Sequence, residues 1–336
     1  MSAGGRPAQI KMETPENILV IRLKSIGDVL FTLPAVNALR ENFPESKITF
    51  LTSKENKPLL RGFREVSDVI PLDRKALRSP LHSVAETFRL LRQLRAGKFS
   101  LVVDFQGYGE TAWLSWWSGA RERWGSVYGA GRQWAYTCGV TRNPRIHPAD
   151  WNLSLMQQCG LRMGEIRNEF ILSDDVLAEA RKFFTENNLD VTKPTLFLQP
   201  FTSTPLKNWP LENYLALAHF WRKRGVQIIF SGGPGDKTRL EPARTDGFIV
   251  AAGIPDAGLM KLSTVIVGGD TGFLHLAVAL QKRVIMLIMD GGAGSAVPFR
   301  HPDWAIKAPS GLTVEHIKVD DVLKACATAF QECGVA

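Results

Sequence analysis

Apolar residues along this chain gather in short runs that alternate with amphipathic stretches. The first run, residues 18–23, is apolar and partly β-branched, which predicts a buried parallel strand. It ends at the turn Ser25-Ile26-Gly27-Asp28. Residues 29–39 then place apolar side chains at helical spacing, with Pro34 as the one dissonant residue. Strand, small-residue turn and helix in this order predict the opening of a βαβ unit.

The same alternation continues along the chain. It predicts strands at 47–51, 69–70, 101–105, 195–198, 226–230, 265–267 and 284–288, and helices at 81–95, 175–186, 211–224 and 273–280. The aromatic, basic and glycine-rich segment 107–145 is interpreted as a site-forming insertion. We therefore expect an α/β protein with a flexible N-terminus (1–16), an N-terminal Rossmann-like domain (17–168), a C-terminal Rossmann-like domain (169–318) and a closing helix (319–336).

Composition and charge narrow the choice of partner. The chain is 45% hydrophobic and 22% charged, as globular proteins are, and its formal net charge of +8 favours an anionic partner. The basic residues are dispersed and match no nucleic-acid-binding motif, so a nucleotide, a glycolipid or a membrane surface is favoured over nucleic acid. No apolar run reaches the about 18 residues of a membrane span, so any membrane contact is expected to be peripheral.

The four cysteines bear on the compartment. Cys138, Cys159, Cys326 and Cys333 form no C-x-x-C pair and lie near no histidine cluster, so neither a zinc site nor a disulfide framework is predicted. A reducing, cytoplasmic location is the resulting expectation.

Four polar or glycine-rich turns follow predicted strands, at 25–28, 199–207, 231–236 and 268–272. At the carboxyl ends of parallel strands, the N–H groups of the following helices attract anions. None of these turns reads G-x-G-x-x-G, and no G-x-x-x-x-G-K-[ST] occurs, which disfavours a dinucleotide-dependent dehydrogenase and a P-loop NTPase. A nucleotide diphosphate held between two such domains remains.

Each candidate residue also has a purely structural interpretation. Asp270 or Thr271 can be the N-cap of the next helix, whereas His275, one turn further on, can add charge toward a bound phosphate or simply pack. Lys207 can neutralise a departing phosphate or be merely solvated. Asp28 can cap its helix or act as the general base that deprotonates an acceptor hydroxyl.

Five segments together resemble glycosyltransferase family 9, which comprises the ADP-heptose:lipopolysaccharide heptosyltransferases and their relatives. They are ILVIRLKSIGDVLFTLPAVNALR (18–40), LVVDFQG (101–107), KNWP (207–210), GGPGD (232–236) and DTGFLH (270–275). The resemblance implies a GT-B fold, in which two Rossmann-like, doubly wound domains face each other across a cleft. It also implies inverting, metal-independent transfer from ADP-heptose to a Kdo or heptose hydroxyl of the lipopolysaccharide inner core. We expect a monomer without a cofactor, at the cytoplasmic face of the inner membrane.

The resemblance also assigns site residues. Asp28 matches the family's catalytic base, and Lys207 is expected to stabilise the departing ADP. Asp236 matches the position that binds the adenosine ribose, and Asp270 is expected to orient the sugar hydroxyls. The complete expected donor set is Thr202, Ser203, Lys207, Asp236, Asp270, Thr271, Gly272 and His275. The anionic glycolipid acceptor is expected at Gly27, Lys57, Arg61, Arg64 and Arg132; for the basic residues among these, the alternative is a solvated face.

Two departures from the family pattern leave the donor open. The family carries a phenylalanine-glycine-proline loop after its last strand, whereas residues 289–295 here read MDGGAGS, and Gly269 stands where Asn or Val is common. A different nucleotide sugar or glycan acceptor, or a non-catalytic binding scaffold, are the alternatives; the presence of both Asp28 and Lys207 argues against the scaffold.

The tryptophans between Trp113 and Trp134 have two interpretations. The cluster can rest at a membrane interface, whereas the helical spacing of Trp113 and Trp117 favours packing inside the domain.

Overall fold

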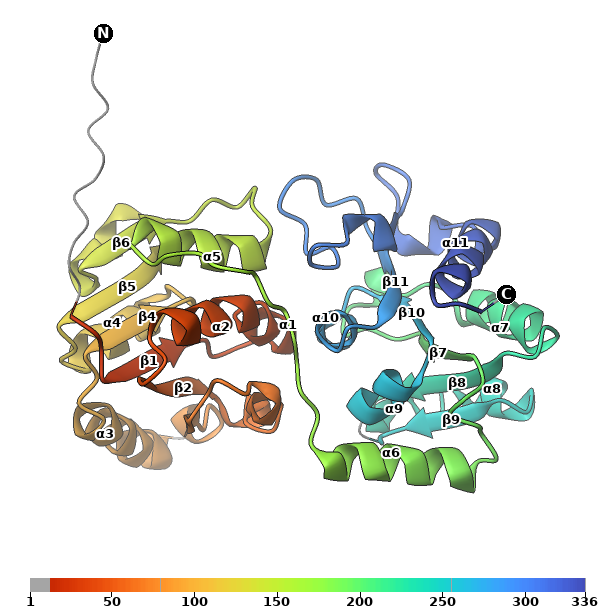
Figure 1. Cartoon of the computed structure of the whole chain (residues 1–336), viewed down its shortest axis with the longest axis horizontal. Coiled ribbons are helices and arrows are strands. Elements are labelled where there is room, and N and C mark those ends of the chain that lie inside the picture. Colours follow the sequence, from red (N-terminus) through yellow and green to blue (C-terminus); the bar gives the residue numbers. More distant parts are fainter. Residues whose placement is uncertain (1–12, 79, 255, 336) are drawn as a thin grey trace, which may run out of the picture. The chain divides into compact units, whose positions relative to one another are not determined.

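The computed structural model describes residues 13–78, 80–254 and 256–335, and the chain forms two compact units (Figure 1). Unit 1 comprises the chain up to Asn143 together with Pro148–Asn168, and unit 2 comprises Pro144–His147 and the chain from Glu169 onward. Each unit has one parallel six-stranded sheet, so the predicted α/β class with two Rossmann-like units is confirmed.

The sheet of unit 1 has the order β3-β2-β1-β4-β5-β6. Its strands are β1 (Asn17–Ile21), β2 (Lys47–Ser53), β3 (Asp68–Leu72), β4 (Leu101–Asp104), β5 (Glu122–Val127) and β6 (Cys138–Thr141). The central strand β1 pairs with β2 and β4, with Ile18 opposite Ile48 and Leu101. Ile18 and Leu19 are fully buried, as expected of an apolar run with helices on both faces of its sheet.

The helices of unit 1 begin with a pair that replaces the single predicted helix. They are α1 (Ile26–Leu30), α2 (Leu33–Asn42), α3 (Pro80–Ala96), α4 (Gly109–Trp117) and α5 (Pro148–Gln158). Pro34 occupies the second position of α2, where the missing N–H would have no partner within the helix. The proline therefore begins a helix here.

Two predictions for unit 1 are wrong. Segment 107–145 is no insertion, because it supplies α4, β5 and β6 and so completes the sheet; Trp124 on β5 is only 2% exposed. The absence of a disulfide was also predicted wrongly. Cys138 on β6 is bonded to Cys159, which follows α5. Their separation of 21 residues gave no sign of the pairing, since it depends on how α5 packs beside the sheet.

The sheet of unit 2 has the order β12-β11-β10-β7-β8-β9. Its strands are β7 (Thr195–Gln199), β8 (Gln227–Gly232), β9 (Ile249–Ala252), β10 (Val265–Gly269), β11 (Arg283–Ile288) and β12 (Ala305–Lys307). The helices are α6 (Asp174–Glu186), α7 (Leu211–Arg222), α8 (Glu241–Thr245), α9 (Asp256–Leu262), α10 (Gly272–Ala279) and α11 (Val319–Glu332). Trp209 and Tyr214 meet edge to face in the core beneath α7, with ring centroids 4.9 Å apart.

The strand orders locate the sites. In unit 1 the chain runs outward from β1 to β3 and then resumes on the other side of β1 with β4; in unit 2, β7 and β10 have the same relationship. Ligands of doubly wound sheets bind where the order reverses in this way, outside the carboxyl ends of the two strands. The loops after β1 and β4, and those after β7 and β10, are therefore the places to examine.

No helix within the described part of the chain is both long enough and apolar enough to cross a membrane.

Candidate functional site

In unit 2, the loops after β7 and β10 bring Lys207, Asp270 and His275 together. Lys207 ends a short 3₁₀ turn, Pro205–Lys207, and its Nζ lies 2.6 Å from Oδ2 of Asp270. The other oxygen of Asp270, Oδ1, lies 3.3 Å from Nε2 of His275 on α10. His275 is buried, whereas Lys207 and Asp270 keep 35% and 25% of their side chains exposed. The imidazole therefore faces the carboxylate in this structure.

The electrostatics of this group favour an ionised Asp270. Burial by itself would raise the pKa of the carboxyl, but the hydrogen bonds and electrostatic interactions that Asp270 makes with His275 and Lys207 outweigh burial and lower the pKa to about 2. Asp270 is consequently a carboxylate at neutral pH. It can accept hydrogen bonds from hydroxyl groups of a ligand, and it holds the Lys207 ammonium at the mouth of the loop.

The turn before α10 is rigidly held. Thr271 is the N-cap of α10 and accepts a hydrogen bond from the N–H of Leu274 at 3.4 Å. Its hydroxyl also donates to Oε1 of the buried Gln199, at the end of β7, at 3.3 Å. Gly272 is the first residue of the helix, so the amide groups at this end face the loop in the manner of an anion site. The N-cap role foreseen for Asp270 or Thr271 therefore falls to Thr271.

Gly269 is required by close packing between the two loops. A Cβ at this position would lie 2.7 Å from Cγ2 of Thr202 and 2.9 Å from the carbonyl oxygen of Lys207. Thr202 itself is fixed, since its N–H donates to Asn208 and its hydroxyl donates to the carbonyl of Thr204. A larger residue at this position would therefore require the two loops to move apart. Ser203, next to Thr202, is exposed.

A cavity of about 340 Å³ opens beside this group. Lys207 and Asp270 line it together with the segment that follows β11, including Met289, Gly291 and Gly294. The glycine-rich loop, which the sequence shows to differ from the family pattern, thus forms one wall of the cavity. Gly294 also packs against the carbonyl of Pro144, with which an added Cβ would collide at 2.0 Å.

Asp236 has its carboxylate engaged within its own loop. It ends the 3₁₀ turn Pro234–Asp236 after β8, where Oδ2 accepts from the N–H of Gly233 at 2.9 Å and Oδ1 pairs with Arg239 at 2.9 Å. Binding of a ribose by Asp236 would compete with the ion pair to Arg239.

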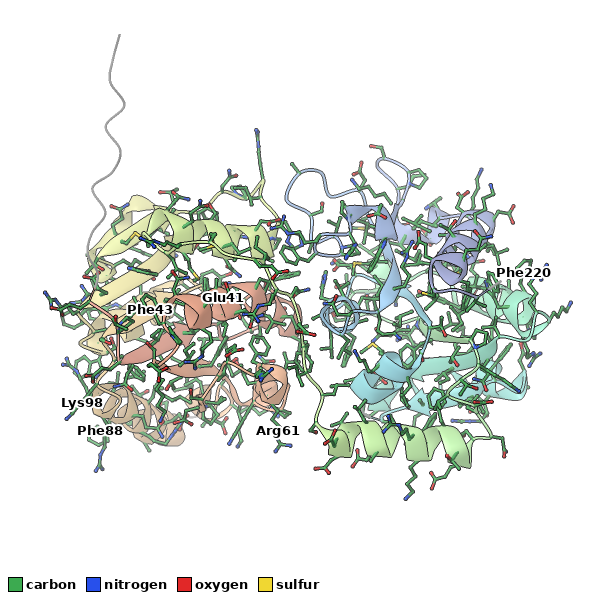
Figure 2. All side chains as sticks on the ribbon, in the orientation of Figure 1. Glu41, Phe43, Arg61, Phe88, Lys98 and Phe220 are labelled. Atoms are coloured by element: carbon green, nitrogen blue, oxygen red, sulfur yellow. A yellow bond between two sulfur atoms is a disulfide. The ribbon has the colours of Figure 1, made fainter. Side chains whose placement is uncertain are left out.

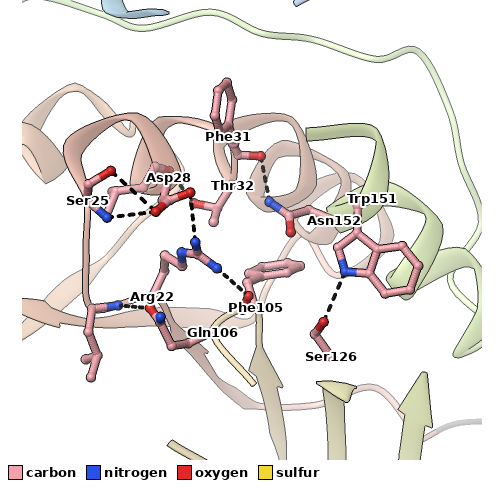
Figure 3. Close-up of polar contacts among 12 residues, drawn as sticks. Arg22, Ser25, Asp28, Phe31, Thr32, Phe105, Gln106, Ser126, Trp151 and Asn152 are labelled. Carbon is pink, nitrogen blue, oxygen red and sulfur yellow. Dashed lines mark hydrogen bonds and ion pairs between the residues drawn. The ribbon is translucent and has the colours of Figure 1, made fainter. Parts of the chain in front are cut away.

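In unit 1, Asp28 lies at the third position of α1 and is clamped from two sides (Figure 3). Oδ2 accepts from the N–H of Ser25 at 3.0 Å and from its hydroxyl at 3.3 Å, and Oδ1 lies 2.8 Å from Nη2 of Arg22. Ser25 is the N-cap and Asp28 completes its capping box, so the predicted alternative that Asp28 is itself the N-cap is wrong. With 36% of its side chain exposed, Asp28 remains accessible to a ligand.

Arg22 connects the two strands at the switch point. It follows β1, and its Nη1 donates to the carbonyl of Phe105, after β4, at 2.6 Å (Figure 3). Its side chain is only 12% exposed. The guanidinium therefore has little freedom, and it fixes the position of Oδ1 of Asp28.

A second set of buried bonds holds the loop after β4. The N–H groups of Gln106 and Gly107 donate to Oδ1 of Asp104, and Tyr136 donates to Oδ2 at 2.7 Å. Burial raises the pKa of Asp104, against the effect of these hydrogen bonds. Gln106 in turn accepts from the N–H of Leu23 at 3.2 Å. Asp104 thereby stabilises the loop on which the contact of Arg22 depends.

The predicted acceptor residues are spread over several turns of unit 1. Lys57, Arg61 and Arg64 are exposed on the turns after β2, Gly27 is buried within α1, and Arg132 donates to the carbonyl of Gly107 at 3.1 Å. A cavity of about 270 Å³ lies nearby, lined by Lys24, Ser53, Glu55, Asn56, Arg74 and Lys75. None of the predicted acceptor residues is among its lining residues.

Sequence reasoning missed Arg22, Gln199, Lys24, Arg74 and Lys75. Lys24 and Gln199 directly follow predicted strands and Arg22 lies near the end of one, which is the sequence signal that could have indicated these three. Arg74 and Lys75 lie beyond the short predicted strand 69–70 and carried no such signal.

Comparison with known proteins gives a consistent result. The model of the family described as "Glycosyltransferase family 9 (heptosyltransferase)" matches residues 87–290. The lipopolysaccharide core heptosyltransferase OpsX of Haemophilus influenzae is 24% identical over 285 residues, which cover 83% of this chain and 75% of that protein.

Two solved structures share the fold. The family 9 glycosyl transferase of Veillonella parvula superposes with a TM-score of 0.85 at 20% identity, covering 94% of this chain and 97% of that one. The ADP-heptose lipopolysaccharide heptosyltransferase II of Escherichia coli superposes with a TM-score of 0.77 at 18% identity, covering 94% and 99%. These likenesses agree with the GT-B fold class.

Proposed function

Since the chain belongs to glycosyltransferase family 9, we propose that it transfers a heptosyl group from ADP-heptose to a Kdo or heptose hydroxyl of the lipopolysaccharide inner core, with inversion and without a metal ion. The relatives support this assignment through what they are named for: lipopolysaccharide core heptosyl transfer in H. influenzae and use of ADP-heptose in E. coli. Unit 2 would bind the donor and unit 1 the acceptor.

The observation that carries the proposal is the state of Asp28. A general base needs an accessible carboxylate oxygen in a fixed direction. Asp28 is partly exposed, and its two oxygens are held by Arg22 at 2.8 Å and by Ser25 at 3.0 and 3.3 Å. It lies at the end of β1, where doubly wound sheets place ligands.

In the proposed step, the acceptor hydroxyl gives its proton to the carboxylate of Asp28 while its oxygen forms a bond to the anomeric carbon of the heptose. The bond between that carbon and the diphosphate oxygen breaks, and ADP leaves with the electron pair. Lys207 would compensate the charge that develops on ADP, together with the N–H groups at the start of α10.

Binding of the diphosphate implies an exchange of partners. Lys207 now lies 2.6 Å from Asp270, and a phosphate oxygen would take up part of that interaction. Asp270 would then accept hydrogen bonds from the sugar hydroxyls, while the contact with His275 keeps the carboxylate in place. The donor site would be completed by Thr202, Ser203, Thr271 and Gly272. Asp236 would bind the ribose hydroxyls once these replace Arg239 as its partner.

The anionic acceptor would bind in the basic cavity of unit 1. Lys24, Arg74 and Lys75 line it beside a single acidic residue, Glu55, so a carboxylate or phosphate group of a glycolipid would meet a net positive charge there. Lys57, Arg61, Arg64 and Arg132 would extend this basic surface. Because the proposed acceptor is a lipopolysaccharide precursor, we infer that the protein acts at the cytoplasmic face of the inner membrane. We infer further that it acts there as a monomer.

The decisive experiment is turnover of ADP-heptose with a lipopolysaccharide precursor that ends in Kdo or heptose, followed by mass spectrometry of the glycolipid. Asp28→Asn should abolish transfer and leave ADP binding in calorimetry unchanged. Asp68→Asn, at an exposed aspartate of unit 1, is the matched control. Full transfer by the Asp28 variant would refute the assigned base.

One observation favours a second candidate, transfer of a different sugar. The loop after β11 lines the donor cavity and departs from the family pattern. Turnover with a UDP- or GDP-sugar, in place of ADP-heptose, would select this alternative.

A further inference from the structure

Helix α4 buries small side chains against the domain and exposes its tryptophans. Thr111, Ala112 and Ser115 form its buried face, with no more than 1% exposure. Its tryptophans point outward: Trp113, Trp116 and Trp117 are 56%, 44% and 36% exposed. A helix that needed only to cover its sheet would turn its tryptophans inward, because burial of an aromatic side chain stabilises the fold.

These rings form one connected patch. Trp134, from the 3₁₀ turn Ala130–Ala135, is 49% exposed, and its ring centroid lies 4.9 Å from that of Trp113 and 6.3 Å from that of Trp116. Trp116 and Trp117 are 6.5 Å apart. The prediction that Trp113 and Trp117 are packed is therefore wrong, since both side chains are exposed and the ring of Trp113 meets those of the exposed Trp116 and Trp134.

Helix α3 extends the patch with basic and apolar side chains. The guanidinium of Arg95 lies over the ring of Trp117, 5.2 Å from its centroid. Phe88, seven residues earlier and thus on the same helical face, is 68% exposed, and Figure 2 labels it at the edge of unit 1. Val84, a further turn back, is 73% exposed, and Arg92 is exposed beside Arg95.

We propose that this surface, the Trp–Arg face (Phe88, Arg95, Trp113, Trp116, Trp117 and Trp134), binds an anionic lipid bilayer. Monomeric proteins rarely expose apolar patches of this kind without a partner. Tryptophan is the residue enriched at the level of lipid headgroups, and arginines beside it complement the negative charge of the phosphates. An apolar centre with a cation at its edge, Arg95 over Trp117, matches the interface of a bilayer more closely than the apolar patch of a second copy.

The inference rests on the proposed function, because the acceptor assigned there is embedded in a membrane, and the described residues include no helix able to span one. The Trp–Arg face would hold the enzyme at that surface. The inference adds to the proposed function the surface that contacts the membrane and the chemistry of that contact. Vesicle binding can be measured without any sugar transfer, so the inference and the proposed function can fail separately.

The test is flotation of the full-length protein with vesicles of phosphatidylethanolamine and phosphatidylglycerol, compared with vesicles of phosphatidylcholine alone. We expect binding to the anionic vesicles that weakens with salt. Arg95→Gln should weaken it about fivefold, and Trp113→Ser combined with Trp116→Ser on the order of tenfold. Lys223→Gln and Leu312→Ser, at exposed positions of unit 2, are the matched controls and should bind as the wild type does.

Two further measurements separate the possible outcomes. Thermal unfolding checks that the variants fold, and transfer to an acceptor without acyl chains should persist in the tryptophan variant. Vesicle binding that is unchanged in the folded variants, or absent in an active wild type, overturns the inference and leaves the proposed function standing. A different result would be a wild-type dimer that the tryptophan changes convert to a monomer, with vesicle binding unaffected. That result would identify the face as a contact between two copies and would also overturn the inference. Lipid binding without transfer to any acceptor would count against the proposed function alone.

Discussion

The ammonium group of Lys207 and the carboxylate of Asp270 lie 2.6 Å apart at the point where the strand order of unit 2 reverses. The same carboxylate faces His275 through its other oxygen. Asp270, which could bind sugar hydroxyls, thus holds in place Lys207, which could bind a diphosphate. The two groups are therefore oriented toward each other by the protein itself.

This arrangement predicts a dependence of stability on pH. The pKa of Asp270 is lowered from 3.8 to about 2 in the folded protein, so its ionised form stabilises the fold. The contribution, about 2 kcal/mol, should be complete above about pH 5 and should vanish as the pH falls toward 2. We expect Asp270→Asn to lower the free energy of unfolding at pH 7 by about that amount and by clearly less at pH 3, in urea titrations. An equal loss at both pH values would contradict the linkage.

Removal of the Lys207 charge should act on ligand binding. In Lys207→Met we expect affinity for ADP to fall about tenfold, since one charge-assisted contact contributes on the order of 1.4 kcal/mol. Isothermal titration calorimetry measures this, and Lys324→Met, at an exposed position of α11, serves as the control. Unchanged ADP affinity would show that Lys207 does not contact the diphosphate.

Arg22 should act as a positioning residue for Asp28. Arg22→Gln is expected to lower kcat by one to two orders of magnitude, because a misdirected base loses the advantage of orientation. The KM for the nucleotide sugar, which we propose binds to unit 2, should be unchanged. Arg22→Lys should recover part of the loss, since it keeps the charge but not the two-sided hydrogen bonding. A rise in donor KM with kcat preserved would assign Arg22 to donor binding.

Gly269 offers a test of loop packing. Gly269→Ala should destabilise the protein by about 1–3 kcal/mol, because the new Cβ would meet Thr202 and the backbone of Lys207. Gly235→Ala is the control, as a Cβ there has nothing within 4 Å. Addition of Thr202→Ser should relieve part of the effect by removing the nearer methyl group. Thermal unfolding that is identical for the two glycine variants would refute this packing.

The basic cavity of unit 1 competes with the exposed turns after β2 for the acceptor. If the cavity binds its anionic group, Arg74→Gln should raise the acceptor KM about tenfold and leave kcat nearly unchanged. Arg61→Gln, at one of the positions inferred from sequence, should have a smaller effect. Steady-state kinetics at varied acceptor concentration compares the two variants, and the reverse ranking would favour the exposed turns.

The central strands could be predicted because both of their faces are buried. The runs that became β1, β7, β10 and β11 are continuously apolar, a pattern that a parallel sheet covered on both sides requires. The turns that follow them could be predicted because each apolar run stops at polar or glycine residues. The outer strands β6 and β12 are short, only partly buried and poor in such runs, so local pattern does not separate them from loops. β9 is apolar but only four residues long, and a run this short does not by itself predict a strand.

The contacts of the site residues could not be predicted. Arg22 and Asp28 lie six residues apart. Their ion pair depends on the turn capped by Ser25, which brings the start of α1 close to the end of β1. The pairing of Lys207 with Asp270 spans 63 residues and requires β7 and β10 to be neighbours. Sequence could suggest which side chains lie at strand ends, but tertiary contacts decide which oxygen faces which cation.

The shared strand order of the two sheets has an evolutionary consequence. Each unit repeats the same architecture and carries its own switch point, and apart from Pro144–His147 the two lie on separate stretches of the chain, divided at Asn168 and Glu169. If unit 2 binds the donor and unit 1 the acceptor, as proposed, mutations in one half can alter one substrate preference while the other half keeps its own. Lineages of such proteins could diversify by recombination near this boundary, which would join an existing sugar specificity to a new recipient in a single event.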